Sequence, residues 1–433
     1  MDTLFLGARL IDPETGSDRI GALRVREGAI RDIIYDAAPD QSGAHVIDGA
    51  GLCLAPGLVD IGVKICEPGE RHKESFRTAG MAAAAGGVTT VVTRPDTLPA
   101  IDTPEALEFQ MRRATEAEPV RIAPMAALTK GRDGREMTEI GFLQDAGAVA
   151  FTDCDRVVEN TKVFARCLSY AKSLGALVMA HVQEPILSRD AAATSGARAS
   201  RMGLSSVSPI AERIALDRDI ALVEMTGAAY HADQITTARA LPTLRRAKDS
   251  GLDVTAGVSI HHLTLTEADI EEYRTFFKVK PPLRAEEDRQ AVLEALRAGL
   301  IDTASSMHTP QDEESKRLPF EEAASGAVGL ETFLPVLLRI VEEGALSLPQ
   351  AFRAAAFAPA ARLGLPGGRL APGAPADLVL FDPSETRMLD RYDLKSKSKN
   401  TPFDGTEMPG RVIGTWIAGK RVFNAEASRD AAD

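Results

Sequence analysis

The sequence is poor in the features that mark secreted and membrane-spanning proteins. Only four of its 433 residues are cysteine, and Cys53, Cys66, Cys154 and Cys167 include no CxxC pair. Free thiols in a reducing cytosol are therefore expected, rather than a disulfide framework. No run of about 18 apolar residues occurs, which predicts no membrane span. The N-terminal MDTLFLGARLID lacks the pattern of a signal peptide.

Positive charge is also scarce. Lysine and arginine number 50 against 62 aspartate and glutamate residues, so the formal net charge is −12. An acidic chain is a poor match for nucleic acid or for an anionic membrane surface. We therefore expect a cytoplasmic protein that has neither kind of partner.

The middle of the chain contains an alternation of short apolar runs and amphipathic stretches. The helical stretches include TPEALEFQMRRATEA and EEDRQAVLEALRAG. Eight strand–helix units over about 300 residues indicate a (β/α)8 TIM-like barrel, with an open doubly wound sheet as the alternative. The eight expected strands lie within residues 57–65, 87–95, 120–129, 147–153, 175–182, 227–235, 252–260 and 301–307.

Both ends of the chain contain a different pattern. Short stretches of alternating apolar and polar residues are separated by glycine and proline turns. Because chain termini often lie close together, we expect residues 1–55 and 365–433 to form one small β domain. Residues 56–364 would then form the barrel.

Few side chains at the predicted strand ends suit catalysis. The chemistry of such barrels lies at the carboxyl ends of the strands, and a hydrolytic zinc site needs about three protein ligands. Asp153 and His181 are the good candidates, although a lone histidine on a strand is more often a packed, hydrogen-bonded residue. The sequence contains no HxH, HExxH, CxxC or GxSxG motif. Possible additional ligands are Cys66, Cys154, His261, His262 and His308.

Several motifs resemble those of the dihydroorotases of the amidohydrolase superfamily, in particular the long bacterial type that associates with aspartate transcarbamoylase. They run almost from end to end and include LAPGLVDI, EPGE, AAAAGGVTTV, ALTKG, MTEIG, DAGAVAF, FKVKPPLRAEEDR, VGLETFLP, PADLVLFDP and LKSKSKNTPFDG. The resemblance implies a barrel of the amidohydrolase type with a small β domain built from both termini.

The same resemblance implies that most metal ligands have been replaced. Two of the family's six metal-holding positions are kept, as Asp153 and His181. The histidines of the first-strand His-x-His are Gly62 and Lys64, the histidine of strand six is Gln234, and the aspartate that serves as ligand and general base is Met307. Three substrate-binding positions of the family, an arginine and two asparagines, are Cys66, Asp96 and Lys280.

We therefore expect a vestigial pocket that has no catalytic residue and holds no metal. Lys64 is predicted to reach Asp153 and to replace the missing dication, unless it extends out of the mouth or pairs elsewhere. Met307 would fill the vacated volume. The residues expected in this pocket are Gly62, Lys64, Cys66, Asp96, Gln234, His262, Lys280, Met307 and His308.

Three functions fit this reading. The first, implied by the resemblance, is a pseudoenzyme of pyrimidine biosynthesis that assembles with aspartate transcarbamoylase catalytic chains in a homo- or hetero-oligomer. The second is a zinc-dependent cyclic amidohydrolase whose rebuilt site uses Cys66, Asp153, His181 and His308. The third is a ligand-binding sensor that keeps the pocket without the chemistry.

Overall fold

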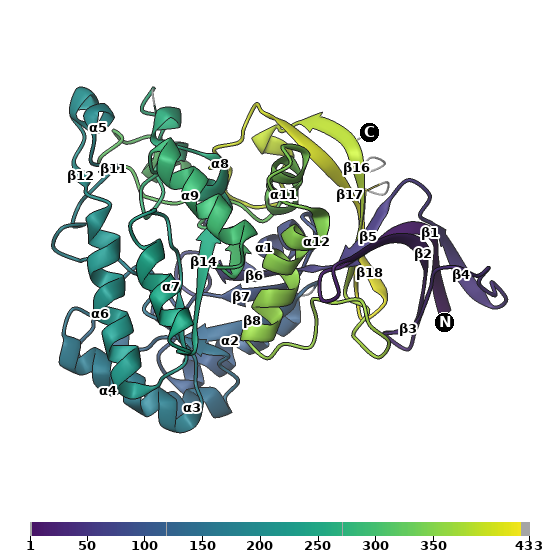
Figure 1. Cartoon of the computed structure of the whole chain (residues 1–433), viewed down its shortest axis with the longest axis horizontal. Coiled ribbons are helices and arrows are strands. Elements are labelled where there is room, and N and C mark those ends of the chain that lie inside the picture. Colours follow the sequence, from purple (N-terminus) through teal and green to yellow (C-terminus); the bar gives the residue numbers. More distant parts are fainter. Residues whose placement is uncertain (1, 118, 271, 426–433) are drawn as a thin grey trace.

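The chain folds into a parallel barrel with a separate sheet on one side (Figure 1). The structure is a computed structural model that describes residues 2–117, 119–270 and 272–425. The parts of the predicted small domain at residues 1 and 426–433 lie outside this description.

The barrel strands occur where the eight apolar runs predict them. They follow one another in chain order in one parallel sheet, with β11 (Ala193–Thr194) and β12 (Ser206–Val207) paired outside it. Every residue of the first two strands is buried, as expected for strands covered on both faces. The eight are β6 (Leu58–Val63), β7 (Val88–Thr93), β8 (Arg121–Ala126), β9 (Ala150–Phe151), β10 (Val178–Ala180), β13 (Tyr230–Ala232), β14 (Val254–Ser259) and β15 (Thr303–Ser305).

Two hydrogen bonds draw the ends of this sheet together. The backbone N–H of Ser306, just after β15, donates to Asp60 Oδ1 of β6 at 2.8 Å. The N–H of Lys64 donates to the carbonyl of His308 at 2.9 Å. The sheet is thus a nearly closed barrel, which confirms the predicted fold class over the open sheet.

Helices cover the outside of the barrel. Asn160 caps α4 (Thr161–Leu174) by accepting the N–H groups of Lys162 and Val163, and Gly175 ends the helix at a φ of 66°. Shorter 3₁₀ turns are η1 (Lys130–Arg132), η2 (Glu267–Ile270), η3 (Thr275–Phe277) and η5 (Arg391–Asp393), and η4 (Arg353–Phe357) is a π-helical turn. The helices are α1 (Phe76–Ala85), α2 (Pro104–Ala117), α3 (Ile140–Asp145), α4 (Thr161–Leu174), α5 (Ala197–Met202), α6 (Ile210–Thr226), α7 (Leu241–Asp249), α8 (Ile260–Thr264), α9 (Glu286–Arg297), α10 (Glu313–Lys316), α11 (Phe333–Glu342), α12 (Leu348–Phe352) and α13 (Ala358–Arg362). Among the described residues, no helix is both long enough and apolar enough to cross a bilayer.

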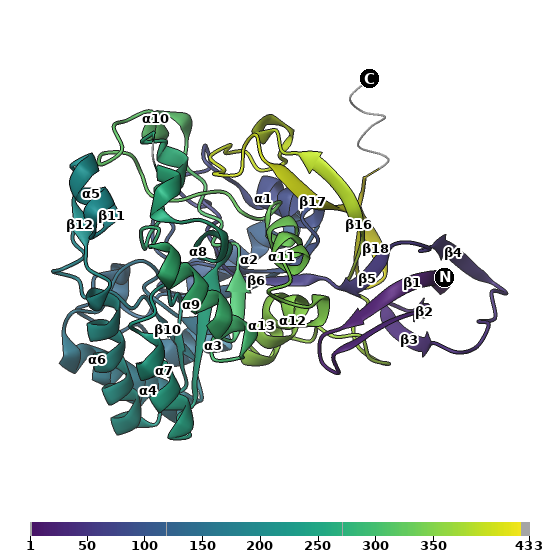
Figure 2. The ribbon, with the colours of Figure 1, turned by 45° about the horizontal axis from the view of Figure 1, so that its top comes forward.

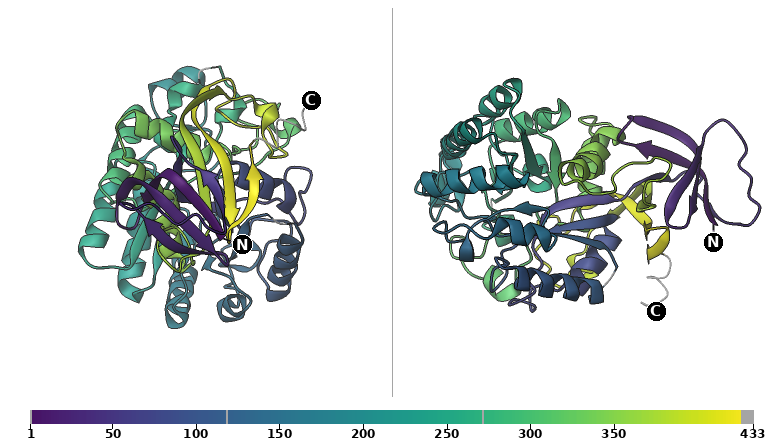
Figure 3. Two further views of the ribbon diagram at one scale, coloured as in Figure 1. Left: turned by 90° about the vertical axis from the view of Figure 1, so that its right-hand side faces the viewer. Right: turned by 90° about the horizontal axis from the view of Figure 1, so that it is seen from below.

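The second sheet combines both ends of the chain. Strand β5 (Cys53–Pro56) lies between β1 (Asp2–Asp12), to which it is parallel, and β16 (Leu378–Met388), to which it is antiparallel. The purple N-terminal strands project from one side of the barrel in the right-hand view of Figure 3. The strands are β1 (Asp2–Asp12), β2 (Ser17–Arg26), β3 (Ala29–Ile34), β4 (Ala44–Asp48), β5 (Cys53–Pro56), β16 (Leu378–Met388), β17 (Glu407–Ile417) and β18 (Lys420–Asn424).

A loop of this sheet reaches the barrel mouth. The loop at 394–403 connects β16 to β17 and contacts the segments that follow β6 and β15. The Ser396 hydroxyl and the Lys397 N–H donate to the buried Glu74 carboxylate, and Asn400 Nδ2 donates to the Gly326 carbonyl at 3.0 Å. The KSKSKN motif therefore fixes the mouth segments in place.

Candidate vestigial active site

The carboxyl ends of the barrel strands surround a small cavity of about 110 Å³. Six of the predicted pocket residues line it: Lys64, Asp96, Gln234, His262, Lys280 and Met307. Gly62, Cys66 and His308, and the retained Asp153 and His181, are not among the side chains that line this cavity. Most of the side chains that line the cavity are charged or polar, and the larger apolar ones are Val279 and Met307.

Met307 lies directly over Gly62. A Cβ atom at position 62 would be 2.9 Å from Met307 Sδ and 4.0 Å from Asp233 Oδ1, and the φ of Gly62 is +89°. Separations below 3.0 Å are essentially never seen for a real Cβ. The thioether therefore occupies the space into which any side chain at position 62 would project, as predicted for Met307.

Lys64 does not pair with Asp153, so that prediction was wrong. Its Nζ lies 3.4 Å from Glu70 Oε2 and 3.5 Å from Asp96 Oδ2. The positive φ at Gly62 distorts β6 near its end, and the β6–β7 register shifts between Ile61 and Val63. Alternation along a regular strand consequently fails to predict where the Lys64 side chain points.

The hydrogen-bond partners of Asp153 come from the segment that follows the neighbouring strand β8. Its Oδ1 accepts the N–H groups of Leu128 and Thr129 at 3.1 and 3.0 Å, and its Oδ2 accepts the Thr129 hydroxyl at 2.5 Å. Burial raises the pKa of Asp153, against the lowering effect of these hydrogen bonds. The carboxylate is satisfied without any counter-ion at position 64.

His181 is a neutral, buried imidazole. Its Nε2 is buried without a hydrogen-bond partner among the described residues. Burial, followed by the nearby positive charge of Lys280, lowers its pKa to about 3. Of the two retained ligand positions, His181 alone has an unpaired buried donor or acceptor atom.

His308, Cys66 and His262 serve as packed structural groups. His308 Nδ1 accepts the Gly329 N–H at 3.2 Å, and Nε2 lies 3.5 Å from the Glu74 carboxylate. The Cys66 thiol is buried, which raises its pKa to about 12. His262 shares a 2.7 Å hydrogen bond with the Ser259 hydroxyl. These contacts are those of fixed core residues.

The sequence did not predict that three cationic side chains would surround the Asp155 carboxylate. Arg132 donates to Asp155 Oδ1 at 2.6 Å, Lys280 donates to Oδ2 at 3.3 Å, and Arg94 lies 3.9 Å away. Burial opposes ionisation of Asp155, but Arg94, Lys280 and Arg132 together hold its pKa well below the ordinary value. The signal was present in TRPD and FTDCDR, which directly follow two strands and therefore reach the mouth.

Arg94 connects this group to Lys64. Its guanidinium donates to Asp96 Oδ2 at 3.0 Å, and Asp96 is also the partner of Lys64. Ammonium and guanidinium groups thus neutralise the carboxylates at the mouth. The positive charge predicted to replace the dication is present, but it neutralises Asp96 and Asp155 instead of Asp153.

This donor set does not fit a zinc site. Across residues 2–117, 119–270 and 272–425, no group of three or more His, Cys, Asp or Glu side chains is placed to hold one ion. Cys66, Asp153, His181 and His308 are therefore not assembled into the rebuilt site of the alternative reading. Both oxygens of Asp153 already accept hydrogen bonds, and His308 Nε2 lies 3.5 Å from the Glu74 carboxylate. Among the two retained ligand positions, His181 Nε2 is therefore the one unpaired nitrogen, which is fewer than the three ligands that zinc needs.

Lys64→Ala is expected to lower the free energy of unfolding by about 1 kcal/mol, because each carboxylate keeps a second cation. Asp96 retains Arg94, and Glu70 retains Lys73 at 2.5 Å. Urea denaturation of both proteins measures the change. Lys130→Ala is the matched control, since its ion pair with Glu136 is solvent-exposed and is expected to contribute less than about 0.5 kcal/mol. A loss above about 3 kcal/mol for Lys64→Ala would contradict this sharing of partners.

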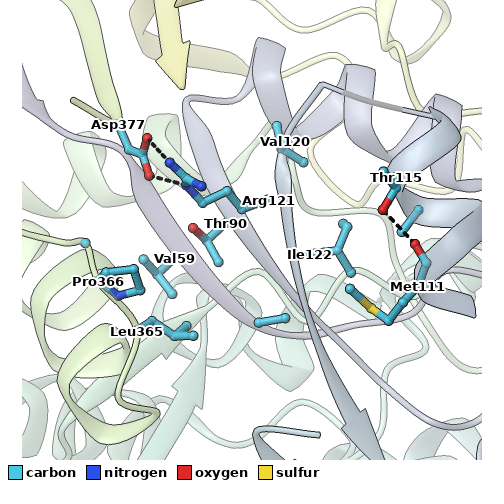
Figure 4. Close-up of a pocket in the computed structure, with 13 residues that line it drawn as sticks. Val59, Thr90, Met111, Thr115, Val120, Arg121, Ile122, Leu365, Pro366 and Asp377 are labelled. Carbon is cyan, nitrogen blue, oxygen red and sulfur yellow. Dashed lines mark hydrogen bonds and ion pairs between the residues drawn. The ribbon is translucent and has the colours of Figure 1, made fainter. Parts of the chain in front are cut away.

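A larger and more apolar cavity lies at the opposite end of the barrel. It has a volume of about 420 Å³ and is lined by Val59, Thr90 and Ile122, near the amino ends of β6, β7 and β8 (Figure 4). An ion pair between Arg121 and Asp377 joins the barrel to the second sheet at its edge. None of the predicted site residues lines this cavity.

Comparison with known proteins gives consistent relationships along the whole chain. A family model described as Dihydro-orotase-like matches residues 51–240. The dihydroorotase of Desulforapulum autotrophicum is 37% identical over 423 residues, covering 98% of this chain and 99% of that protein. A dihydroorotase-like protein of Pseudomonas putida is 38% identical over 420 residues, covering 97% and 98%.

Solved structures share the fold. The L-hydantoinase (dihydropyrimidinase) of Arthrobacter aurescens superposes with a TM-score of 0.88 at 25% identity, covering 98% of this chain and 96% of that one. The dihydropyrimidinase of Brevibacillus agri superposes with a TM-score of 0.85 at 22% identity. These barrels support the fold assignment independently of the strand pattern.

Proposed function

Because the chain belongs to the dihydroorotase-like family, we propose that it is a non-catalytic member that acts as an assembly partner of aspartate transcarbamoylase catalytic chains. One observation carries the non-catalytic part of this proposal. The Met307 thioether fills the space above Gly62. By the sequence resemblance, these are two positions that hold metal ligands in the dihydroorotases. A thioether accepts no proton as a general base, and Gly62 offers no donor atom.

The charge balance at the barrel mouth and the formation of both sheets support a structural role. The mouth carboxylates Asp96 and Asp155 are neutralised by lysine and arginine, so the mouth needs no metal for charge balance. Within the described residues, the eight-stranded barrel and the second sheet are both formed, with the 394–403 loop bound at Glu74. A protein that has lost its chemistry while keeping its whole framework suits a role that depends on its surface.

A second candidate is a cyclic amidohydrolase with an altered site. It is favoured by the relatives, which are named dihydroorotase and hydantoinase, and by the unpaired, buried Nε2 of His181, one of the two retained ligand positions. On this reading the chain would bind at least one zinc ion and hydrolyse a cyclic amide. The comparisons support this candidate better than the first, whereas the arrangement of possible metal ligands favours the first.

Co-purification tests the assembly role. We expect the tagged chain to retain the aspartate transcarbamoylase catalytic chains of the same host through size-exclusion chromatography, in one complex heavier than either component. The transcarbamoylase should be incompletely assembled, or less active, in cells from which this chain is deleted. If that enzyme is fully assembled and active without this chain, the assembly role is wrong.

A further inference from the structure

An exposed hollow lies on the surface where loops of the barrel meet a loop of the second sheet. It has a volume of about 600 Å³ and is built from residues 273–276, Glu313 and Lys316 of α10, the following residues 317–318, the turn at 391–392, and Asp404. In Figure 2, α10 lies at the top of the barrel and the yellow segments of the second sheet lie nearby. We call this surface the arginine–aromatic hollow.

The hollow exposes large apolar side chains. Tyr392 is 63% exposed, Tyr273 46% and Leu318 45%. Exposed apolar groups scattered singly are normal, but these three line one concavity. Tyrosine and arginine are, with tryptophan, the side chains enriched at the energetic centres of protein–protein interfaces.

Its arginines are already fixed in place. The guanidinium carbons of Arg274 and Arg391 lie 5.1 and 5.2 Å from the centre of the Phe276 ring. Arg274 also donates to Asp404 at 2.9 Å, and Arg391 donates to the Tyr392 hydroxyl at 2.7 Å. Side chains that are held in this way lose little freedom when a partner binds.

The charge of the hollow is opposite to that of the whole chain. Three guanidiniums, those of Arg274, Arg317 and Arg391, face two carboxylates, those of Glu313 and Asp404. The Lys316 amine lies buried and donates to three backbone carbonyls. A net positive, aromatic surface on a protein of net charge −12 is suited to an acidic partner.

We propose that the arginine–aromatic hollow is the docking surface for a partner protein that inserts an apolar side chain flanked by carboxylates. This inference rests on the proposed assembly role and assigns it a location. The partner's carboxylates would pair with Arg317 and its neighbours, and its apolar side chain would pack against Tyr392 and Leu318. Arg317 is 73% exposed with Glu313 as its ion-pair partner, so it can rearrange to meet an incoming acid.

Two substitutions test the surface in the full-length protein. Tyr392→Ala is expected to weaken binding of aspartate transcarbamoylase catalytic chains at least about tenfold, since it removes an aromatic group at the centre of the contact. Arg317→Glu is expected to weaken it several-fold and to reduce its dependence on salt concentration. Binding is measured by isothermal titration calorimetry at two salt concentrations.

Phe142→Ala is the matched control. Phe142 is 65% exposed on α3, compared with 63% for Tyr392, and lies outside the hollow. It should leave binding unchanged, and circular dichroism should show all variants folded. Wild-type binding that neither Tyr392→Ala nor Arg317→Glu weakens would overturn the docking surface while leaving the assembly role standing. If the wild type does not bind at all, both the docking surface and the assembly role are wrong. If the variants alter only the self-association of this chain, the hollow binds a second copy of the chain instead.

Discussion

Purified chain supplied with zinc is expected to hydrolyse dihydroorotate no faster than buffer does. Zinc lowers the pKa of its bound water from about 15.7 to about 7, which represents on the order of 10 kcal/mol of nucleophile activation. The described residues offer no group of three ligands to hold that ion, and Met307 cannot act as a base. The measurement is the absorbance of dihydroorotate over time, together with the zinc content of the dialysed protein.

The dihydroorotase of Desulforapulum autotrophicum, assayed in parallel, is the positive control. Met307→Asp alone should not restore hydrolysis, because Gly62, Lys64 and Gln234 remain without ligand atoms suited to zinc. Replacing all four positions together, with histidine at 62, 64 and 234 and aspartate at 307, should restore retention of zinc. Near-stoichiometric zinc in the unmodified protein, with hydrolysis above that of buffer, would establish the amidohydrolase candidate and refute the non-catalytic one.

Arg284→Ala is expected to lower the free energy of unfolding by about 3–5 kcal/mol. Arg284 is 2% exposed and lies 3.6 Å from the fully buried Glu212 carboxylate. Its guanidinium also donates to the hydroxyls of Thr236 and Thr194, at 3.0 and 3.1 Å. Truncation would leave Glu212 as a buried charge that has lost its cation. Urea denaturation followed by circular dichroism measures the change.

Arg297→Ala supplies the matched control. Arg297 forms an ion pair with Glu294 on α9, and both side chains are more than half exposed. Its loss is expected to change stability by less than about 0.5 kcal/mol. If the two variants are equally stable, the Arg284–Glu212 pair does not stabilise the contact between α6 and the segment that precedes α9.

The fold could be predicted from the sequence because its signals are local. Apolar runs such as those at 87–95 and 252–260 coincide with β7 and β14, and the helices occur between them. Even the contribution of both ends to one sheet follows from the strand-like patterns before β6 and after α13. Patterns of this kind depend only on residues that lie close together in the sequence, so they can be recognised from the sequence alone.

The sequence predicted most of the residues that line the mouth cavity, but not which charged side chains form ion pairs there. Six of the predicted residues line the mouth cavity, since their positions at strand ends determine their height in the barrel. The partners of Lys64 could not be predicted, because the positive φ at Gly62 distorts the end of β6. The Arg94, Arg132 and Asp155 contacts were missed for a related reason: the orientations of flexible charged side chains depend on three loops that are distant in sequence.

The position of β5 between two strands that are distant in sequence leaves one of its edges unpaired during synthesis of the chain. Leu54 pairs with Leu10 on one side and with Leu380 on the other. The ribosome must add more than 300 residues between the two neighbours of β5, which takes roughly 15–60 s at ordinary elongation rates. During that interval one edge of the N-terminal strands is unpaired and able to join another chain. A nascent chain of this kind benefits from a chaperone, and any truncation before β16 is expected to release a polypeptide prone to aggregation.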